Sequence, residues 1–221
     1  MRNSKPLNWT AGVVAVLASG WLAHYLLPSP PPIDPRAHFG AGEALAAEAM
    51  RLGDSSSRII AIVRDMVEFK VPAAKAQLDG FQAALKTAGR PPAVLRIMKD
   101  DPLRVVGVQS GEFLELLRQA KENDVFVSFL GPPVLTDDQL RKLGPKRPKV
   151  VALCSGAMPA RVDLGKVFAQ QLLHAVVVSR PDAPVQPGLG DNRKAFEFMF
   201  KVITTQNLAE LGALSTTAAK N

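Results

Sequence analysis

Short apolar runs alternate with longer amphipathic segments along most of this chain. The apolar runs are rich in Val, Ile and Leu, a composition that favours strands buried on both faces of a sheet. We expect strands at residues 58–63, 94–98, 125–130, 149–153 and 175–178. The segments between them carry apolar residues at helical spacing. We expect helices at residues 39–52, 72–88, 110–121, 136–143 and 164–173.

This alternation of strands and helices predicts an α/β fold. Parallel neighbouring strands need a crossover connection, and a helix of this length provides one. The predicted architecture is a single doubly wound, mostly parallel sheet with helices on both faces, a Rossmann-like or flavodoxin-like three-layer sandwich. We expect this domain to span residues 37–212.

The pattern changes after the fifth predicted strand. A loop rich in Pro and Gly at residues 181–192 is followed by a segment, Phe196 to Val202, in which Phe and Val occupy every second position. This period of two predicts an edge strand. Thr205 is a suitable N-cap for a short last helix at residues 206–211, and we expect a disordered tail at residues 213–221.

An apolar segment near the N-terminus is long enough to cross a membrane. Trp9 to Leu27 covers 19 residues without Lys, Arg, Asp or Glu, close to the roughly 20 residues that span a ~30 Å hydrocarbon core. Basic residues precede it, so the positive-inside rule places residues 1–8 in the cytoplasm. We expect a single-pass transmembrane helix or signal anchor at residues 9–27, a proline-rich stalk at residues 28–36 and a periplasmic domain beyond them. The alternative is a secretory signal that is cleaved, which leaves a secreted domain.

Composition narrows the classes of function further. The formal net charge is +7, and without Arg2 and Lys5 it is +5, from 25 basic and 20 acidic residues. This modest excess, in a chain poor in aromatic residues and without a matching motif, gives no support to nucleic-acid binding. Cys154 is the single cysteine, so an internal disulfide and a multi-cysteine metal site are both excluded. It ends an apolar run, where we expect a small core residue rather than a nucleophile.

Polar residues follow the carboxyl ends of the predicted strands. In open α/β sheets, ligands bind beyond these ends, at the point where the strand order reverses. The candidate ligand-binding residues on this rim are Asp65, Lys99, Asp101, Ser155 and Arg180. The alternative is that these residues only turn the chain and cap the next helix.

The chain contains none of the motifs that mark common enzyme classes. Neither a GxGxxG turn, a phosphate-binding loop nor a GxSxG elbow is present. The sequence therefore predicts no cofactor, no metal site and no enzymatic activity. One enzymatic alternative uses Asp65 and Asp101 as a carboxylate pair that binds a metal ion for hydrolysis.

The apolar strand Ile59-Ile60-Ala61-Ile62-Val63 leads to a helix that contains the sequence AQLDGFQAAL, at residues 76–85. With the later strand and turn at residues 150–156, this segment resembles one lobe of the type 1 periplasmic substrate-binding proteins, the ribose-binding and LacI-like superfamily. The resemblance covers residues 59–181 and implies a fold for solute binding. Those proteins close two lobes around a solute, whereas this chain has residues for one lobe, so the resemblance implies that a dimer or a partner supplies the other wall.

The chain is also similar to flavodoxin-like response-regulator receivers, but it lacks their phospho-acceptor site.

Together, these features predict a membrane-anchored, extracytoplasmic, non-enzymatic binding or interaction module of the cell envelope. Its expected partners are the membrane and another protein or a second copy of the chain. The alternative is half of a substrate-binding protein, or a sensor, that binds a small-molecule solute at the rim as a dimer.

Overall fold

The computed structural model describes residues 12–19, 21, 33–65, 71–98, 107–145, 147–181, 183 and 190–211. The chain divides into two compact units, Met1–Ile33 and Asp34–Asn221. In the first unit, residues 12–19 are helical and exposed. Across the described ranges, we find no helix with the length and apolar composition that a membrane crossing requires. Much of the predicted anchor, residues 28–32 of the predicted stalk and the predicted tail at 213–221 lie outside the described residues.

The second unit is built on one six-stranded sheet in the order β2-β1-β3-β4-β5-β6. The strands are β1 (Ile59–Arg64), β2 (Val94–Met98), β3 (Val125–Ser128), β4 (Lys149–Cys154), β5 (Ala175–Ser179) and β6 (Phe200–Thr204). The first five are parallel, and β6 pairs with β5 in the antiparallel direction. The prediction of a single, mostly parallel sheet is therefore confirmed. Because β2 and β3 lie on opposite sides of β1, the strand order reverses between β1 and β3.

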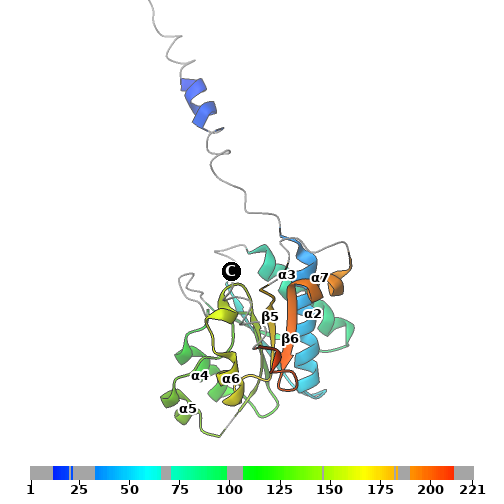
Figure 1. Ribbon diagram of the computed structural model, residues 1–221, viewed down its shortest axis with the longest axis vertical. Helices are drawn as coiled ribbons and strands as arrows, with labels where there is room; N and C mark the ends of the chain where they lie inside the picture. Colours follow the sequence, from blue (N-terminus) through cyan, green and yellow to red (C-terminus); the bar gives the residue numbers. More distant parts are fainter. Residues whose placement is uncertain are drawn as a thin grey trace, which may run out of the picture. The chain divides into compact units, whose positions relative to one another are not determined.

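Helices cover both faces of this sheet, as Figure 1 shows. One face carries α2 (Pro35–Leu52), α3 (Pro72–Thr87) and α7 (Asn192–Met199), and the other carries α4 (Ser110–Gln119), α5 (Asp137–Leu143) and α6 (Leu164–Ala169). A short 3-10 helix, η1 (Met158–Ala160), precedes α6. Alternate residues of β1 enter two separate cores, with Ile60 and Ile62 under α4 to α6 and Ile59 under α2 and α3. Burial on both faces explains the apolar runs of β1, β3, β4 and β5. The strand β2 was expected to be buried in the same way, but it lies at the end of the sheet and is largely exposed.

The first helix of the second unit begins earlier than the predicted start at residue 39. Asp34 is the N-cap of α2, and its carboxylate accepts a hydrogen bond of 2.9 Å from the Arg36 backbone N–H. Pro35 occupies the first helical turn, where its missing N–H has no intrahelical partner to lose. Pro35 and Arg36, which the sequence analysis assigned to the stalk at residues 28–36, are therefore the first residues of a helix.

The predicted edge strand at Phe196 to Val202 is only half right. The structure divides this segment at Met199 and Phe200, with α7 before the division and β6 after it. One local feature and one contact with a distant helix favour the helix. Asp191 caps α7 by accepting a hydrogen bond of 2.9 Å from the Lys194 N–H, and Ala195 is buried against α2. Neither contact can be inferred from the spacing of the Phe residues.

Three other boundaries differ from the sequence predictions. Ser110 is the first residue of α4 rather than its N-cap, and its hydroxyl accepts a hydrogen bond from the Gln139 side chain. The helix α6 ends at Ala169, four residues early, and Gln171 follows in the left-handed region at φ 56°. Residues 205–209 form turns instead of a helix capped by Thr205, because Asn207 and the Thr204 hydroxyl bind the local backbone N–H groups.

Candidate functional site

The carboxyl ends of the five parallel strands lie on one edge of the sheet, which we call the rim. Asp65 lies on the rim directly after β1. Its backbone N–H donates a hydrogen bond of 3.0 Å to the Met98 carbonyl oxygen. This bond extends the pairing of β1 with β2 by one residue, and the half-buried Asp65 therefore has a defined place on the rim. Two further candidates, Lys99 and Asp101, lie outside the described residues.

Ser155 is on the same rim, directly after β4. Its carbonyl oxygen accepts a hydrogen bond of 3.3 Å from the Met158 N–H, and Gly156 between them has a positive φ of 64°. This turn leads into η1 and leaves Ser155 half-buried at the strand end. The residue before it, Cys154, is fully buried, and burial raises the pKa of its thiol to about 12. The rim therefore holds a hydroxyl at β4 and no ionised thiolate at neutral pH.

Arg180 follows β5 at the far side of the rim. Its guanidinium Nη1 donates to the Glu197 carbonyl oxygen at 3.2 Å, and its backbone N–H donates to the Met199 carbonyl oxygen at 2.9 Å. Both acceptors belong to α7. The arginine is therefore held toward the C-terminal end of α7, which places it away from the reversal point between β1 and β3.

The sheet order decides which of these residues lie close together. The strands β1 and β4 flank β3, so Asp65 and Ser155 are separated by about 10 Å, two strand spacings. Arg180 lies one strand further along. The three described candidates therefore share an edge without converging on one point. In the described parts of the chain, no three His, Cys, Asp or Glu side chains come together as a metal site would require.

Ser128, at the end of β3 between them, was not among the predicted site residues. Ser128 is fully buried, and its hydroxyl accepts a hydrogen bond of 3.3 Å from the Leu130 N–H. Gly131 follows with a φ of 100°, which disfavours any residue with a β-carbon. This sharp turn lies at the point where the strand order reverses. The signal was a serine near the end of an apolar run, followed three residues later by Gly131 and then by two prolines.

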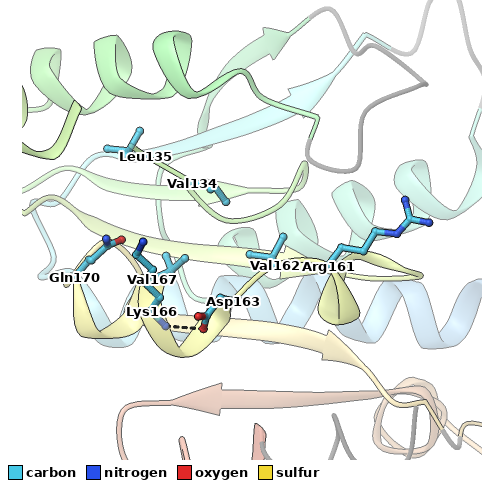
Figure 2. A pocket seen from close by; sticks show the side chains of 8 residues that line it. All are labelled: Val134, Leu135, Arg161, Val162, Asp163, Lys166, Val167 and Gln170. Carbon is cyan, nitrogen blue, oxygen red and sulfur yellow. Dashed lines mark hydrogen bonds between the residues drawn. The ribbon is translucent and has the colours of Figure 1, made fainter. Parts of the chain in front are cut away.

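A partly open cavity of about 230 Å³ lies between α6 and the segment that follows β3. Figure 2 shows Val134 and Leu135 on one side of it and the residues from Arg161 to Gln170 on the other. The full lining set is Val134, Leu135, Arg161, Val162, Asp163, Lys166, Val167 and Gln170. None of the five predicted site residues belongs to it. The sequence carried no periodic signal for the cavity, because its two walls are about 30 residues apart in the chain.

Comparison with known proteins identifies the fold. No protein-family model matches the chain, and no curated protein matches it. Among solved structures, a subunit of an ABC sugar transporter from Rhodobacter sphaeroides matches with a TM-score of 0.52 and 11% identity, over 77% of this chain and 63% of its own. An arabinose-binding protein from Geobacillus stearothermophilus matches with a TM-score of 0.50 and 11% identity, over 80% of this chain and 63% of its own.

A sugar-binding protein of an ABC transporter from Bacillus halodurans also matches, with a TM-score of 0.50 and 12% identity over 77% of this chain and 63% of its own. The resemblance to type 1 periplasmic substrate-binding proteins is therefore confirmed as a likeness of fold. The matched region spans less than two thirds of the length of each of these three structures.

Proposed function

We propose that this chain is an extracytoplasmic, non-enzymatic binding module in which the rim forms one wall of a site for a small solute. The observation that carries the proposal is the sheet order. All five parallel strands end on one edge, and the order reverses between β1 and β3, which is where α/β sheets hold their ligands. The likeness of fold to sugar-binding proteins supports a hydroxyl-bearing solute.

The other wall of this site has to come from a second polypeptide. A rim is open to solvent, whereas small-molecule sites bury most of the ligand surface. The described candidates, Asp65 and Ser155, lie about 10 Å apart across β3 and can bind two different groups of one solute. We propose that a second copy of the chain closes over the solute, so that binding and dimerisation are coupled.

A solute screen tests this proposal directly. The thermal unfolding of the full chain is measured with pentoses, hexoses, amino acids and nucleosides, and we expect one class to raise the midpoint. A solute at about 100 times its Kd stabilises the folded state by about 2.7 kcal/mol. Asp65→Asn and Ser155→Ala should remove most of this stabilisation, whereas Asp138→Asn on α5 should leave it unchanged. If no class raises the midpoint, the rim is not a solute site.

The role of a second copy has its own measurement. Sedimentation of the full chain with and without the stabilising solute should show a shift from monomer toward dimer. A solute that raises the unfolding midpoint while the chain stays monomeric contradicts the two-copy arrangement and leaves the rim as a complete site.

The proposal also places the domain outside the cytoplasm, carried by an anchor at residues 9–27. The support is the apolar segment and its basic N-terminal flank. Alkaline phosphatase fused after residue 36 should be active, and a fluorescent protein fused at the same site should stay dark. The reverse pattern contradicts export. Resistance of the full chain to extraction from membranes by alkaline carbonate distinguishes an anchor from a cleaved signal.

A second candidate function is protein interaction through the edge strand β2. Val94, Leu95 and Ile97 are 39%, 39% and 64% exposed, although they belong to an apolar strand at the end of the sheet. An exposed apolar edge can accept a strand from a partner, because the unpaired backbone groups are already aligned. Ile97→Lys should remove a partner that co-purifies from native membranes, and Phe198→Lys, which alters an apolar residue on α7 that is 51% exposed, should not. A chain that is isolated alone by mild solubilisation contradicts this function.

A further inference from the structure

The strand β2 directs a row of backbone groups to the open side of the sheet. In a strand, the N–H and the carbonyl group of one residue lie on the same side, and successive residues alternate between the two sides. The Met98 carbonyl oxygen faces β1, because it accepts the Asp65 N–H, and the Arg96 backbone therefore faces β1 as well. Leu95 and Ile97 direct their backbone groups away from β1. None of these outward groups forms a hydrogen bond among the described residues.

The side chains of the same two residues add an apolar surface. Leu95 and Ile97 pair with Ala61 and Val63 of β1, so they lie on the face of the sheet that carries α2 and α3. They are nevertheless 39% and 64% exposed. The helix layer therefore leaves room beside β2 for apolar side chains from outside the described domain.

The only charged residue of β2 is Arg96. Its side chain lies on the opposite face, because Arg96 pairs with Ile62, which belongs to the core under α4 to α6. Arg96 is exposed and forms no ion pair within the described parts of the chain. A strand added to β2 would place one side chain directly opposite Arg96, where an opposite charge stabilises the pairing and a like charge destabilises it.

This charge decides between a second copy of the chain and a different partner. Two β2 strands can pair in the antiparallel direction with Leu95 against Ile97 of the second copy, which matches their exposed apolar side chains. The same register places Arg96 directly against Arg96 of the second copy, and like charges in that position are unfavourable. Arg96 therefore opposes self-association through β2 and favours a strand that carries a carboxylate.

We propose that β2 accepts an extended segment of another protein in which one acidic residue stands between two apolar residues. This inference rests on the second candidate function, interaction through β2, and specifies the chemistry of the partner. The apolar side chains cover Leu95 and Ile97 on one face, and the carboxylate pairs with Arg96 on the other. Pro91 and Pro92 lack backbone N–H groups, so the added strand is short and ends near the start of β2.

Hydrogen exchange of the full chain in detergent micelles, followed by NMR, tests whether the edge is open. The amide protons of Leu95 and Ile97 should exchange at least about tenfold faster than that of Arg96, because a hydrogen-bonded amide exchanges only when the strand opens locally. Slow exchange of both amides would show that the edge is already covered, and it contradicts this inference together with interaction through β2.

Two peptides test the charge. The peptide TVEVT, blocked at both ends, has the proposed pattern, and TVKVT reverses its charge. TVEVT should slow the exchange of the Leu95 and Ile97 amides and bind about tenfold more tightly than TVKVT, the difference expected for one charged hydrogen bond. Equal binding of the two peptides overturns the acidic partner, whereas the loss of a co-purified partner in Ile97→Lys would still support interaction through β2.

A charge reversal assigns this preference to one side chain. In Arg96→Glu, at an exposed position, the chain should bind TVKVT more tightly than TVEVT. Lys86→Glu, at an exposed position on α3, is the matched control and should keep the preference for TVEVT. A preference for TVEVT that persists in Arg96→Glu contradicts the pairing with Arg96.

Methylated peptides test the pairing of the backbones. One form of TVEVT is methylated on the amide nitrogen of Glu, and the other on the amide nitrogens of both Val residues. In an added strand of either direction, only one of these two sets of amides faces β2. The two forms should therefore differ in affinity by at least about tenfold, and equal affinities would overturn strand addition.

Discussion

Gly42 of α2 lies directly against the carbonyl oxygen of Gln77 in α3, so that a β-carbon on Gly42 would overlap with that oxygen. The reciprocal contact occurs one turn away, where Gly80 of α3 lies against the carbonyl oxygen of Phe39. The two helices therefore cross with their backbones in contact. Both glycines belong to the helix layer on one face of the sheet.

Alanine at either glycine should separate α2 from α3. We expect Gly42→Ala and Gly80→Ala each to lower the free energy of unfolding by about 3 kcal/mol, because the obstructing atoms are backbone and cannot rotate away. Urea denaturation measures this change. Gly111→Ala in α4, where nothing lies within 4 Å of an added β-carbon, should be neutral or stabilising by up to about 1 kcal/mol. Equal effects at all three positions would contradict the close crossing.

The ion pair of Arg58 with Asp124 ties the start of β1 to the turn before β3. The Asp124 side chain is 2% exposed and accepts hydrogen bonds from Arg58 Nε at 3.0 Å, from Arg58 Nη2 at 2.6 Å and from the Lys121 N–H at 2.8 Å. Asp124→Asn should lower the free energy of unfolding by about 2 kcal/mol, because it removes the charge from a buried carboxylate whose two oxygens both accept hydrogen bonds. Asp138→Asn, in an exposed pair with Arg141, should change stability by well under about 1 kcal/mol.

The lowered pKa of Asp124 also predicts how stability falls at acid pH. Burial by itself raises the pKa of Asp124, but the hydrogen bonds from Arg58 and from the Lys121 N–H outweigh it and hold that pKa below 3.8. A lowered pKa contributes stability that is present above the unfolded pKa and is lost as the pH falls through the folded one. The free energy of unfolding should therefore fall below about pH 4. In Asp124→Asn this fall should be smaller, and an unchanged acid profile would show that the pair does not set it.

Two half-buried histidines, His38 and His174, predict a separate loss of stability that begins nearer to neutral pH as the pH falls. Burial lowers the pKa of His174, with Lys149 and Arg51 adding to the effect, and burial also lowers the pKa of His38 against the opposing charge of Asp34. The unfolded chain therefore takes up protons first, and stability declines as the pH falls below about 6.5.

The variant His174→Asn keeps an acceptor near the Val150 N–H, which donates to His174 Nδ1 at 3.3 Å, but it does not titrate. The decline between pH 7 and 5 should be smaller in this variant than in the parent chain, as measured by denaturation at each pH. An equal decline would assign it to His38 or to other groups.

Cys154 should be inert in the folded protein. Its side chain is fully buried at the end of β4, and the pKa of its thiol is raised to about 12, so the reactive thiolate is absent at neutral pH. Modification by iodoacetamide should follow the unfolded population and accelerate in urea at the midpoint of unfolding. Rapid modification of the native chain would show that β4 opens locally. Cys154→Ala should retain solute binding at the rim.

Some features of the fold were readable from local pattern alone. Four of the five parallel strands, β1, β3, β4 and β5, are buried on both faces, and this burial leaves apolar runs such as residues 150–153. The capping box at Thr136 and Gln139 was equally local, because both hydrogen bonds join residues three positions apart. The predicted rim residues Asp65, Ser155 and Arg180 do lie at strand ends. The distances between them along the rim depend on the strand order, which cannot be inferred from any local sequence pattern.

The sequence by itself determined the α/β class, the parallel strands and the rim to which their ends belong, since strand burial and helix periodicity are properties of neighbouring residues. Only the tertiary structure decided that Phe196 belongs to a helix and Phe200 to a strand, that Gly42 meets Gln77, and that Val134 faces Lys166 across a cavity. Each of these depends on contacts between segments that are distant in the chain, and the packing of those segments outweighs local preference.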